Sequence, residues 1–308
     1  RSGGSLVGRP RFMELHQLRY FVALAETGNF SRAAEACHVT QPSLSQQIKK
    51  LEDELEEPLL VRRMNKSRTI LTEAGEILLK HAKRVLNEVE SAYRAMEDLS
   101  DLTRGSVTMG VIPTIAPYLL PNLVRAFQAT YPRLRLELRE DRTEALLAEL
   151  RAGDTHVAIL SPPVASEFVV HPLFEECLSL CVREDSVLLK RTTVSLDELK
   201  TKPFLLLHQD HCLSGQVEQF CTHHEVSLNT VFRSSQLETI KSMVRSGNGL
   251  SLVPEMAIDR RHPNGLAYVD VTPRLTREVA IVHHRDQPLS RAATAFLSLV
   301  QSQFGKSS

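Results

Sequence analysis

The segment from Phe30 to Leu55 constrains the fold of this chain most strongly, because it contains two helical patterns separated by a short turn. Thr40 is a suitable N-cap for the second helix, and Pro42 falls in its first turn, where a missing N–H costs nothing. Four apolar residues of this helix recur at steps of four, three and four, and therefore share one buried face: Leu44, Ile48, Leu51 and Leu55. Two helices joined in this way are typical of a helix-turn-helix, whose second helix enters the major groove of DNA.

The opposite side of this region is polar. Glutamine, serine and lysine side chains can bond base edges or phosphates, so we expect DNA contacts from both helices. The second helix contributes Gln41, Ser43, Gln46, Gln47, Lys49 and Lys50, and the first contributes Arg32 and Ser31, which is also its expected N-cap. An ordinary three-helix core with a solvated polar side produces the same pattern, and the pattern alone does not separate the two interpretations.

The composition bounds the class of protein. The chain has 308 residues, which suggests two or three domains, and 42% of them are hydrophobic, which is ample for buried cores. No apolar run approaches the roughly 20 residues that a membrane-spanning helix needs, so we expect no membrane partner. Five scattered cysteines and the lack of a recognisable signal peptide indicate a cytoplasmic protein. We expect residues 1–12 to be an added segment before a natural start at Met13.

The net charge is zero, so the overall charge gives no argument for DNA binding. Four basic residues are nevertheless concentrated shortly after the helix-turn-helix: Arg62, Arg63, Lys66 and Arg68. The affinity for DNA would then depend on such local patches and on dimeric binding, and it should fall steeply with salt concentration.

A long helix is predicted after Thr72, which can serve as its N-cap. Its apolar residues alternate steps of four and three without a break, as in a coiled-coil seam: Leu78, Ala82, Val85, Val89, Ala92, Met96 and Leu99. The strict period and the charged flanks favour a dimerising helix, which would present two recognition helices to two DNA half-sites. A lone amphipathic helix packed on its own domain is the alternative.

The rest of the chain alternates between strands and helices. Strands are predicted at 107–112, 134–138, 157–160, 177–182, 204–207, 250–253, 269–271 and 279–283, and helices at 117–130, 143–152, 237–245 and 290–304. This rhythm implies a parallel sheet covered by helices, and it begins again after the strand at 177–182.

The run AAEACHVTQPSLSQQIKKLEDELEEPLLVRR at 33–63, followed by LTEAG at 71–75, resembles the winged helix-turn-helix of the LysR-type transcriptional regulators. The resemblance implies that the helix after Thr40 reads the DNA groove and that a wing at 62–69 contacts the DNA backbone. It implies an α+β multidomain fold with a DNA-binding domain at 13–71, a linker helix at 72–102, and two α/β lobes similar to type 2 periplasmic binding proteins. The lobes would comprise 106–176 with 283–304, and 177–282. The chain would cross between them near Glu176 and His283.

The segment LHQDHCLSGQVEQFC at 207–221, together with IPTIAPYLLP at 112–121, resembles the peroxide-sensing OxyR branch of that family. The resemblance implies that hydrogen peroxide oxidises Cys212 to a sulfenic acid, which Cys221 resolves to a disulfide. It also implies a peroxide pocket made of four side chains: Thr114, Thr143, His211 and Arg285. Members of this branch often carry charged residues soon after the reactive cysteine, where this chain has Ser214 and Gly215.

The spacing of these cysteines has a physical consequence. If 213–221 is helical, nine residues span about 13.5 Å of helix rise, whereas a disulfide needs Cα atoms about 4.4–6.8 Å apart. The bond would therefore require the segment to bend or unwind. Closing a loop of about ten residues corresponds to roughly 2.5–3 kcal/mol in the chain-entropy model. That is comparable with the coupling energies of allosteric proteins, typically about 1–3 kcal/mol.

We therefore predict a gene regulator switched by thiol oxidation, not an enzyme, with no metal or cofactor. Its partners would be double-stranded promoter DNA, hydrogen peroxide, RNA polymerase, and other copies of the chain in a dimer of dimers. A regulator that binds a small organic ligand between its lobes is the main alternative, and a thiol peroxidase or a secreted solute-binding protein fits the sequence less well. A metal site at His223 and His224 matches no standard zinc spacing, and three further cysteines are expected in cores: Cys37, Cys177 and Cys181.

Overall fold

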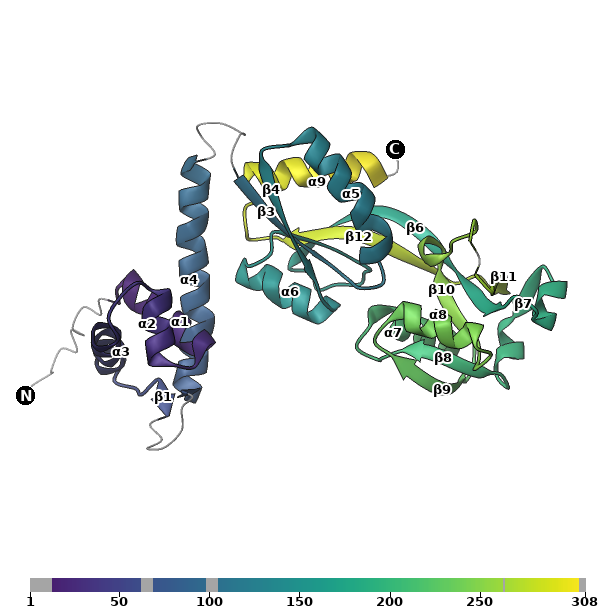
Figure 1. The fold of residues 1–308 in the computed structure, drawn as a ribbon, viewed down its shortest axis with the longest axis horizontal. Helices are drawn as coiled ribbons and strands as arrows, with labels where there is room; N and C mark the ends of the chain where they lie inside the picture. The colour runs from purple at the N-terminus through teal and green to yellow at the C-terminus, as the bar shows by residue number, and fades with distance from the viewer. Residues whose placement is uncertain (1–12, 62–68, 98–104, 263, 305–308) are drawn as a thin grey trace, which may run out of the picture. The chain divides into compact units, whose positions relative to one another are not determined.

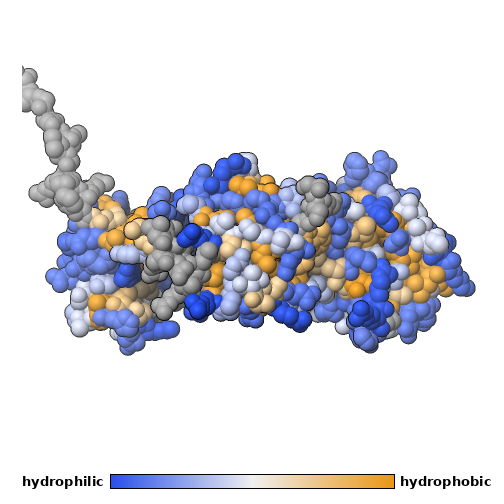
Figure 2. All heavy atoms as spheres, turned by 90° about the horizontal axis from the view of Figure 1, so that it is seen from above, coloured by the Kyte–Doolittle hydropathy of each residue, from blue (hydrophilic) through white to orange (hydrophobic). Residues whose placement is uncertain are grey.

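The computed structural model describes residues 13–61, 69–97, 105–262 and 264–304. The chain forms two compact units, Arg1–Met96 and Glu97–Ser308, both drawn in Figure 1. Among the described residues, no helix is both long enough and apolar enough to cross a membrane. On the face drawn in Figure 2, hydrophobic residues form separate groups between hydrophilic ones rather than one continuous apolar surface.

Three helices of the first unit pack around one apolar core. They are α1 (Leu15–Thr27), α2 (Phe30–Ala36) and α3 (Gln41–Leu55). Phe21, Leu24 and Leu44 are fully buried in this core. Gly28 ends α1 with φ 63°, a left-handed conformation that glycine adopts without strain. The predicted helix-turn-helix is confirmed, with Thr40 as the N-cap residue of α3.

The N-cap of α2 differs from the prediction. Asn29 occupies that position, and its Oδ1 accepts hydrogen bonds from the backbone N–H groups of Ser31 and Arg32 at 2.9 and 3.1 Å. Ser31, the predicted N-cap, is the second residue of the helix instead. Asparagine and serine cap helices about equally well, so the residue types alone favoured neither of the two neighbouring positions.

A short hairpin and a long helix complete the first unit. Strand β1 (Leu60–Val61) pairs antiparallel with β2 (Ile70–Leu71), and α4 spans Glu73–Glu97. Thr72 caps α4 as predicted, since its Oγ1 accepts a hydrogen bond from the N–H of Gly75 at 3.1 Å. A Cβ atom at Gly75 would lie 2.3 Å from the carbonyl oxygen of Leu59, so glycine allows α4 to approach the hairpin this closely. The basic residues of the predicted wing lie outside the described residues: Arg62, Arg63, Lys66 and Arg68.

The apolar seam of α4 has two parts. Near the start of the helix, Ala82 is buried in the three-helix core, as expected for a helix packed on its own domain. Farther along, the side chains of Val85 and Met96 are 42% and 68% exposed. Leu99, at the end of the predicted seam, lies outside the described residues. The second half of α4 thus carries exposed apolar side chains.

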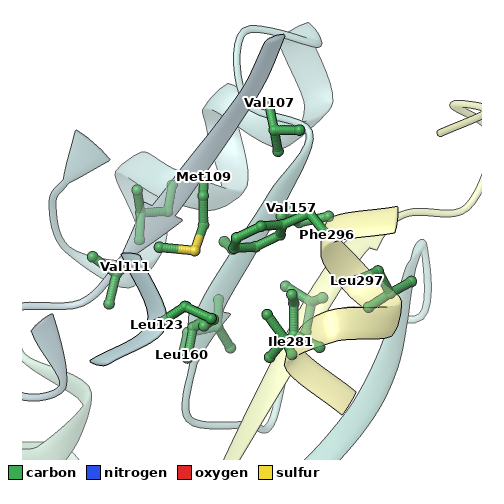
Figure 3. Close-up of a cluster of buried hydrophobic side chains, with 14 of the residues drawn as sticks. Val107, Met109, Val111, Leu123, Val157, Leu160, Ile281, Phe296 and Leu297 are labelled. Carbon is green, nitrogen blue, oxygen red and sulfur yellow. The ribbon is translucent and has the colours of Figure 1, made fainter. Parts of the chain in front are cut away.

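The second unit contains two lobes. In the first lobe, the strands are β3 (Gly105–Val111), β4 (Leu134–Glu140) and β5 (Val157–Leu160), and the helices are α5 (Ala116–Thr130), α6 (Thr143–Ala152) and α9 (Arg291–Phe304). β3 pairs in parallel with β4 and with β5, as the strand–helix rhythm predicted. Side chains from the strands and from the helices meet in one core, in which Met109 of β3 and Phe296 of α9 are fully buried (Figure 3).

The second lobe has its own core. Its strands are β7 (Thr193–Ser195), β8 (Pro203–Leu207), β9 (Asn229–Ser234), β10 (Ser251–Pro254) and β11 (Leu266–Thr272), and its α-helices are α7 (Cys212–His223) and α8 (Leu237–Arg245). β8 and β9 pair in parallel, and Phe204 of β8 packs with Ile240 of α8. The sequence did not predict β9, in which Val231 and Phe232 are both exposed and break the alternation of a half-buried strand.

Two long antiparallel strands, β6 (Phe168–Arg183) and β12 (Thr276–His284), run through both lobes (Figure 1). On β12, Val279 already packs in the first core, whereas Leu275, just before the strand, packs in the second. The chain therefore crosses between lobes at Glu176 and Arg277, which are paired in register. The sequence placed the second crossing near His283, but the structure has it six residues earlier, at Arg277. The sheet is also mixed rather than wholly parallel, because these long strands are antiparallel. The two-lobed α/β architecture itself is confirmed.

Candidate redox site

The site is built at the carboxyl ends of neighbouring strands. Because β3 and β4 are parallel and adjacent, the chain leaves both strands at the same edge of the sheet. Thr114 follows β3, and Thr143 is the first residue of α6 after β4. Cys212 is the first residue of α7 in the other lobe, yet its side chain packs against the core of the first lobe. The thiol therefore lies at the junction of the two lobes.

The surroundings of Cys212 act on its protonation in opposite directions. Burial raises the pKa of the thiol, while the charge of Arg277, the Thr143 hydroxyl and the N–H groups of Leu213 and Cys212 lower it. Burial is the largest effect, so the net pKa is raised. The start of α7 by itself would favour the thiolate, because the positive end of a helix stabilises a negative charge. In the resting site the thiol form is favoured, and a set of groups that stabilise the thiolate surrounds it.

Two buried polar atoms at this junction, Thr143 Oγ1 and His211 Nε2, have no nitrogen or oxygen partner among the described residues, and Thr143 Oγ1 has only the Cys212 thiol to bond. His211 is the N-cap residue of α7, and its burial lowers the pKa of the imidazole. Asp210 Oδ1 lies 4.0 Å from His211 Nε2, too far for a hydrogen bond. A buried hydroxyl and a buried ring nitrogen without nitrogen or oxygen partners can bind a small polar molecule.

Arg277 is the main residue that the sequence did not predict here. Its side chain is fully buried and donates from Nη1 to Thr114 Oγ1 at 2.9 Å, and from Nη2 to the carbonyl oxygen of Thr114 at 3.2 Å. Its Nε donates to Glu176 Oε1 at 2.8 Å, and Glu176 Oε2 accepts the N–H of Met256 at 2.8 Å. The sequence contains a hint of this role. Arg277 is two residues from Val279, so both side chains point to the same, apolar face of the strand, where a charged residue is unusual.

Arg285 was predicted to provide the positive charge of the pocket, and the structure corrects this. Its side chain is exposed and donates from Nη2 to the carbonyl oxygen of Ser166 at 3.1 Å. Eight residues of extended chain separate Arg285 from Arg277, which corresponds to roughly 25 Å. Arg277 lies near the start of β12 and Arg285 just beyond its end, so Arg285 is not brought to Cys212.

Cys221 lies near the other end of α7. Nine residues correspond to about two and a half helical turns, so Cys212 and Cys221 project from opposite sides of the helix. Cys221 is accordingly buried in the core of the second lobe. Burial, together with the charge of Glu218, raises the pKa of its thiol to about 11. All five cysteines are free in this structure: Cys37, Cys177, Cys181, Cys212 and Cys221.

The predicted DNA-facing residues are mostly exposed: Ser31, Arg32, Gln41, Ser43, Gln46, Lys49 and Lys50. Lys50 Nζ lies 3.4 Å from Glu14 Oε1 in an exposed ion pair. Gln47 is half-buried, and its Oε1 accepts a hydrogen bond from Gln17 Nε2 at 3.4 Å. Gln47 is therefore turned toward α1.

Comparison with known proteins agrees with both parts of the chain. Residues 15–76 match the model of the bacterial regulatory helix-turn-helix proteins of the LysR family, and residues 100–305 match the LysR substrate-binding domain. The chain belongs to the LysR family. As such it is a DNA-binding transcriptional regulator and not an enzyme.

Within the LysR family, the chain resembles the OxyR branch. It is 38% identical over 280 residues to the hydrogen peroxide-inducible genes activator of Pectobacterium carotovorum, covering 90% of this chain and 92% of that protein. It is also 38% identical to the DNA-binding transcriptional dual regulator OxyR of Escherichia coli, in a match that covers 90% of this chain and 91% of that protein. A full-length OxyR variant from Pseudomonas aeruginosa has a TM-score of 0.73 at 30% identity, covering 96% of this chain and 99% of that one.

The histidine pair after Cys221 has no further candidate metal ligands arranged around it in the part of the chain that the structure describes. No cluster of three or more histidine, cysteine, aspartate or glutamate side chains there is arranged to hold a metal ion. His223 and His224 are exposed at the end of α7, and their rings contact each other edge-on at a centroid distance of 5.3 Å.

Proposed function

We propose that this LysR-family regulator senses hydrogen peroxide through Cys212 and Cys221. One observation carries the proposal. Cys212 lies among groups that favour its thiolate, including the buried Thr143 hydroxyl, while Cys221 faces the other core from the far side of the same helix. Relatives of this chain are named hydrogen peroxide-inducible genes activators, which supports hydrogen peroxide as the molecule that is sensed.

In the first step, the Cys212 thiolate attacks one oxygen of hydrogen peroxide. The S–O bond forms as the O–O bond breaks, the sulfur loses two electrons, and the departing hydroxide takes up a proton to become water. Thr143 can donate its hydroxyl hydrogen to the thiolate or the peroxide. Thr114 Oγ1 accepts from Arg277, so its own O–H remains available to donate to the peroxide. The Arg277 charge favours the thiolate and the negative charge that develops on the leaving oxygen.

In the second step, the Cys221 sulfur attacks the sulfenic acid sulfur of Cys212. The disulfide forms, and the hydroxyl of the sulfenic acid leaves as water after taking the proton of Cys221. Because α7 holds the two cysteines on opposite sides and about 13.5 Å apart along its axis, the helix must unwind first. Unwinding takes Cys221 out of the second core, and this rearrangement is the signal.

The remaining roles follow from the same interpretation. We assign DNA contacts to the exposed polar side chains of α2 and α3, with Gln47 at the edge of that surface. We assign dimerisation to the exposed half of the α4 seam, and further assembly into a dimer of dimers to the effector lobes. The oxidised assembly would act on transcription through contacts with RNA polymerase.

Peptide mapping after mild oxidation tests the proposal. The reduced full-length protein is treated with less than one equivalent of hydrogen peroxide and digested without reductant. We expect one disulfide, Cys212–Cys221, with Cys37, Cys177 and Cys181 still reduced. An unreacted Cys212 would instead favour a regulator that binds a small organic ligand between its lobes.

Gly215→Ala should lower the equilibrium yield of this disulfide. Gly215 is exposed inside α7, and a Cβ atom there would meet no described atom within 4 Å. Alanine therefore adds helix propensity without a clash, worth up to about 1 kcal/mol and roughly fivefold in an equilibrium that requires unwinding. The yield of disulfide at a fixed thiol–disulfide buffer ratio measures the effect. An unchanged yield would mean that the helix does not unwind here.

A further inference from the structure

Arg233 of β9 makes three contacts that tie α7 to the strand before it. Its Nη1 donates to the carbonyl oxygen of Leu207 at 3.0 Å and to Ser214 Oγ at 3.2 Å, and its Nη2 donates to Glu218 Oε1 at 2.5 Å. Ser214 Oγ in turn donates to the same Leu207 oxygen at 3.0 Å. We call this set of contacts the Arg233 clamp.

The clamp spans the part of α7 that must move. Ser214 and Glu218 are four residues apart and lie on one face of the helix, so a single guanidinium reaches both. Both residues lie between Cys212 and Cys221, inside the loop that the disulfide would close. Ser214 is 1% exposed, and the Arg233 side chain is 25% exposed, so water competes only in part for these hydrogen bonds. The helix cannot unwind between the cysteines unless the clamp opens.

We propose that Arg233 is a positioning residue that holds α7 helical and thereby sets how readily the sulfenic acid of Cys212 is resolved by Cys221. This inference rests on the proposed function and concerns only its second step. Arg233 has no described contact with Cys212, so the first step, the reaction with peroxide, does not depend on it.

Electrostatics alone predict the opposite effect, which makes the inference testable. Glu218 raises the pKa of Cys221, so removal of the neutralising Arg233 would raise this pKa further and slow attack by Cys221. Opening the clamp, by contrast, should speed the same step because the helix unwinds more often. The direction of the change therefore distinguishes the two effects.

The experiment compares full-length Arg233→Met with wild type and with Arg274→Met. The side chain of Arg274 is 67% exposed and lies 3.9 Å from Asp270, so it controls for loss of a surface charge in the same lobe. After a peroxide pulse, trapping with dimedone follows the sulfenic acid, and peptide mapping follows the disulfide. In Arg233→Met we expect sulfenic acid to form at a rate within about twofold of wild type and the disulfide to form about tenfold faster. Ser214→Ala should give a smaller acceleration, and Arg274→Met none.

Equal or slower disulfide formation in Arg233→Met would overturn the inference. Failure of the wild type to form the disulfide at all would overturn the proposed function, and with it this inference. Amide hydrogen exchange of the reduced proteins provides the second test. We expect faster exchange confined to 213–221. Faster exchange throughout β8, β9 and α8 would make Arg233 a general structural residue and would also overturn the inference.

Discussion

Cys212→Ser should abolish the response to peroxide while leaving the fold intact. A serine hydroxyl is not oxidised by peroxide under conditions that convert a thiolate to sulfenic acid, so disulfide formation should fall by more than about 100-fold. The substitution replaces sulfur with oxygen at a half-buried position and leaves Thr143 and Arg277 in place. Peptide mapping after substoichiometric peroxide measures the disulfide, and amide hydrogen exchange verifies the fold.

Two companion variants make this result specific. Cys37→Ser, in the first unit, should leave Cys212 oxidation unchanged and serves as the matched control. Cys221→Ser should accumulate the Cys212 sulfenic acid and pass on to the sulfinic acid in excess peroxide, because no resolving thiol remains. A disulfide that still formed in Cys212→Ser at the wild-type rate would show that another cysteine is the sensor.

Arg277→Met should have the second largest effect, on both stability and oxidation rate. Glu176 would be left buried without its cationic partner, which typically costs about 3–5 kcal/mol. Loss of the charge near Cys212 would also raise the pKa of this thiol further above its usual value, so the pH profile of oxidation should move to higher pH. At neutral pH we expect oxidation to slow by about tenfold or more. Denaturant unfolding and the rate of thiol loss after a peroxide pulse measure the two effects.

The double variant Glu176→Gln with Arg277→Met separates these effects. It removes both buried charges, and a glutamine oxygen can still accept the N–H of Met256. Most of the lost stability should return, while oxidation stays slow. If the double variant oxidised at the wild-type rate, Arg277 would act on stability alone and would have no part in the chemistry.

Where local patterns determine structure, the sequence predicted it well. The bounds of α8 were predicted to the residue, because its apolar spacing is regular and Gly247 follows its end. Thr40 and Thr72 were recognised as helix caps, and the parallel strands of the first lobe followed from their alternation with helices. The resemblance assigned Thr114 and Thr143 to the pocket, and both follow the carboxyl ends of neighbouring strands, where such folds bind ligands.

Long-range contacts explain what the sequence did not determine. The positive charge was assigned to Arg285 instead of Arg277, because only the register of β12 on β6 shows which arginine faces Thr114. The position of Cys212 at the start of α7 favours a lowered pKa, but burial by residues far along the chain outweighs that effect. Arg233 lies on β9, a strand that was not predicted, so its contacts with α7 had no signal in the local pattern.

Amide hydrogen exchange at 213–221, before and after formation of the disulfide, tests the central claim most directly. In the reduced protein we expect these amides to be protected as part of α7. In the oxidised protein their protection should fall by at least about 100-fold, because a helix cannot hold two sulfurs from its opposite sides within bonding distance. A protein with the Cys212–Cys221 bond in place and with unchanged protection at 213–221 would contradict the account.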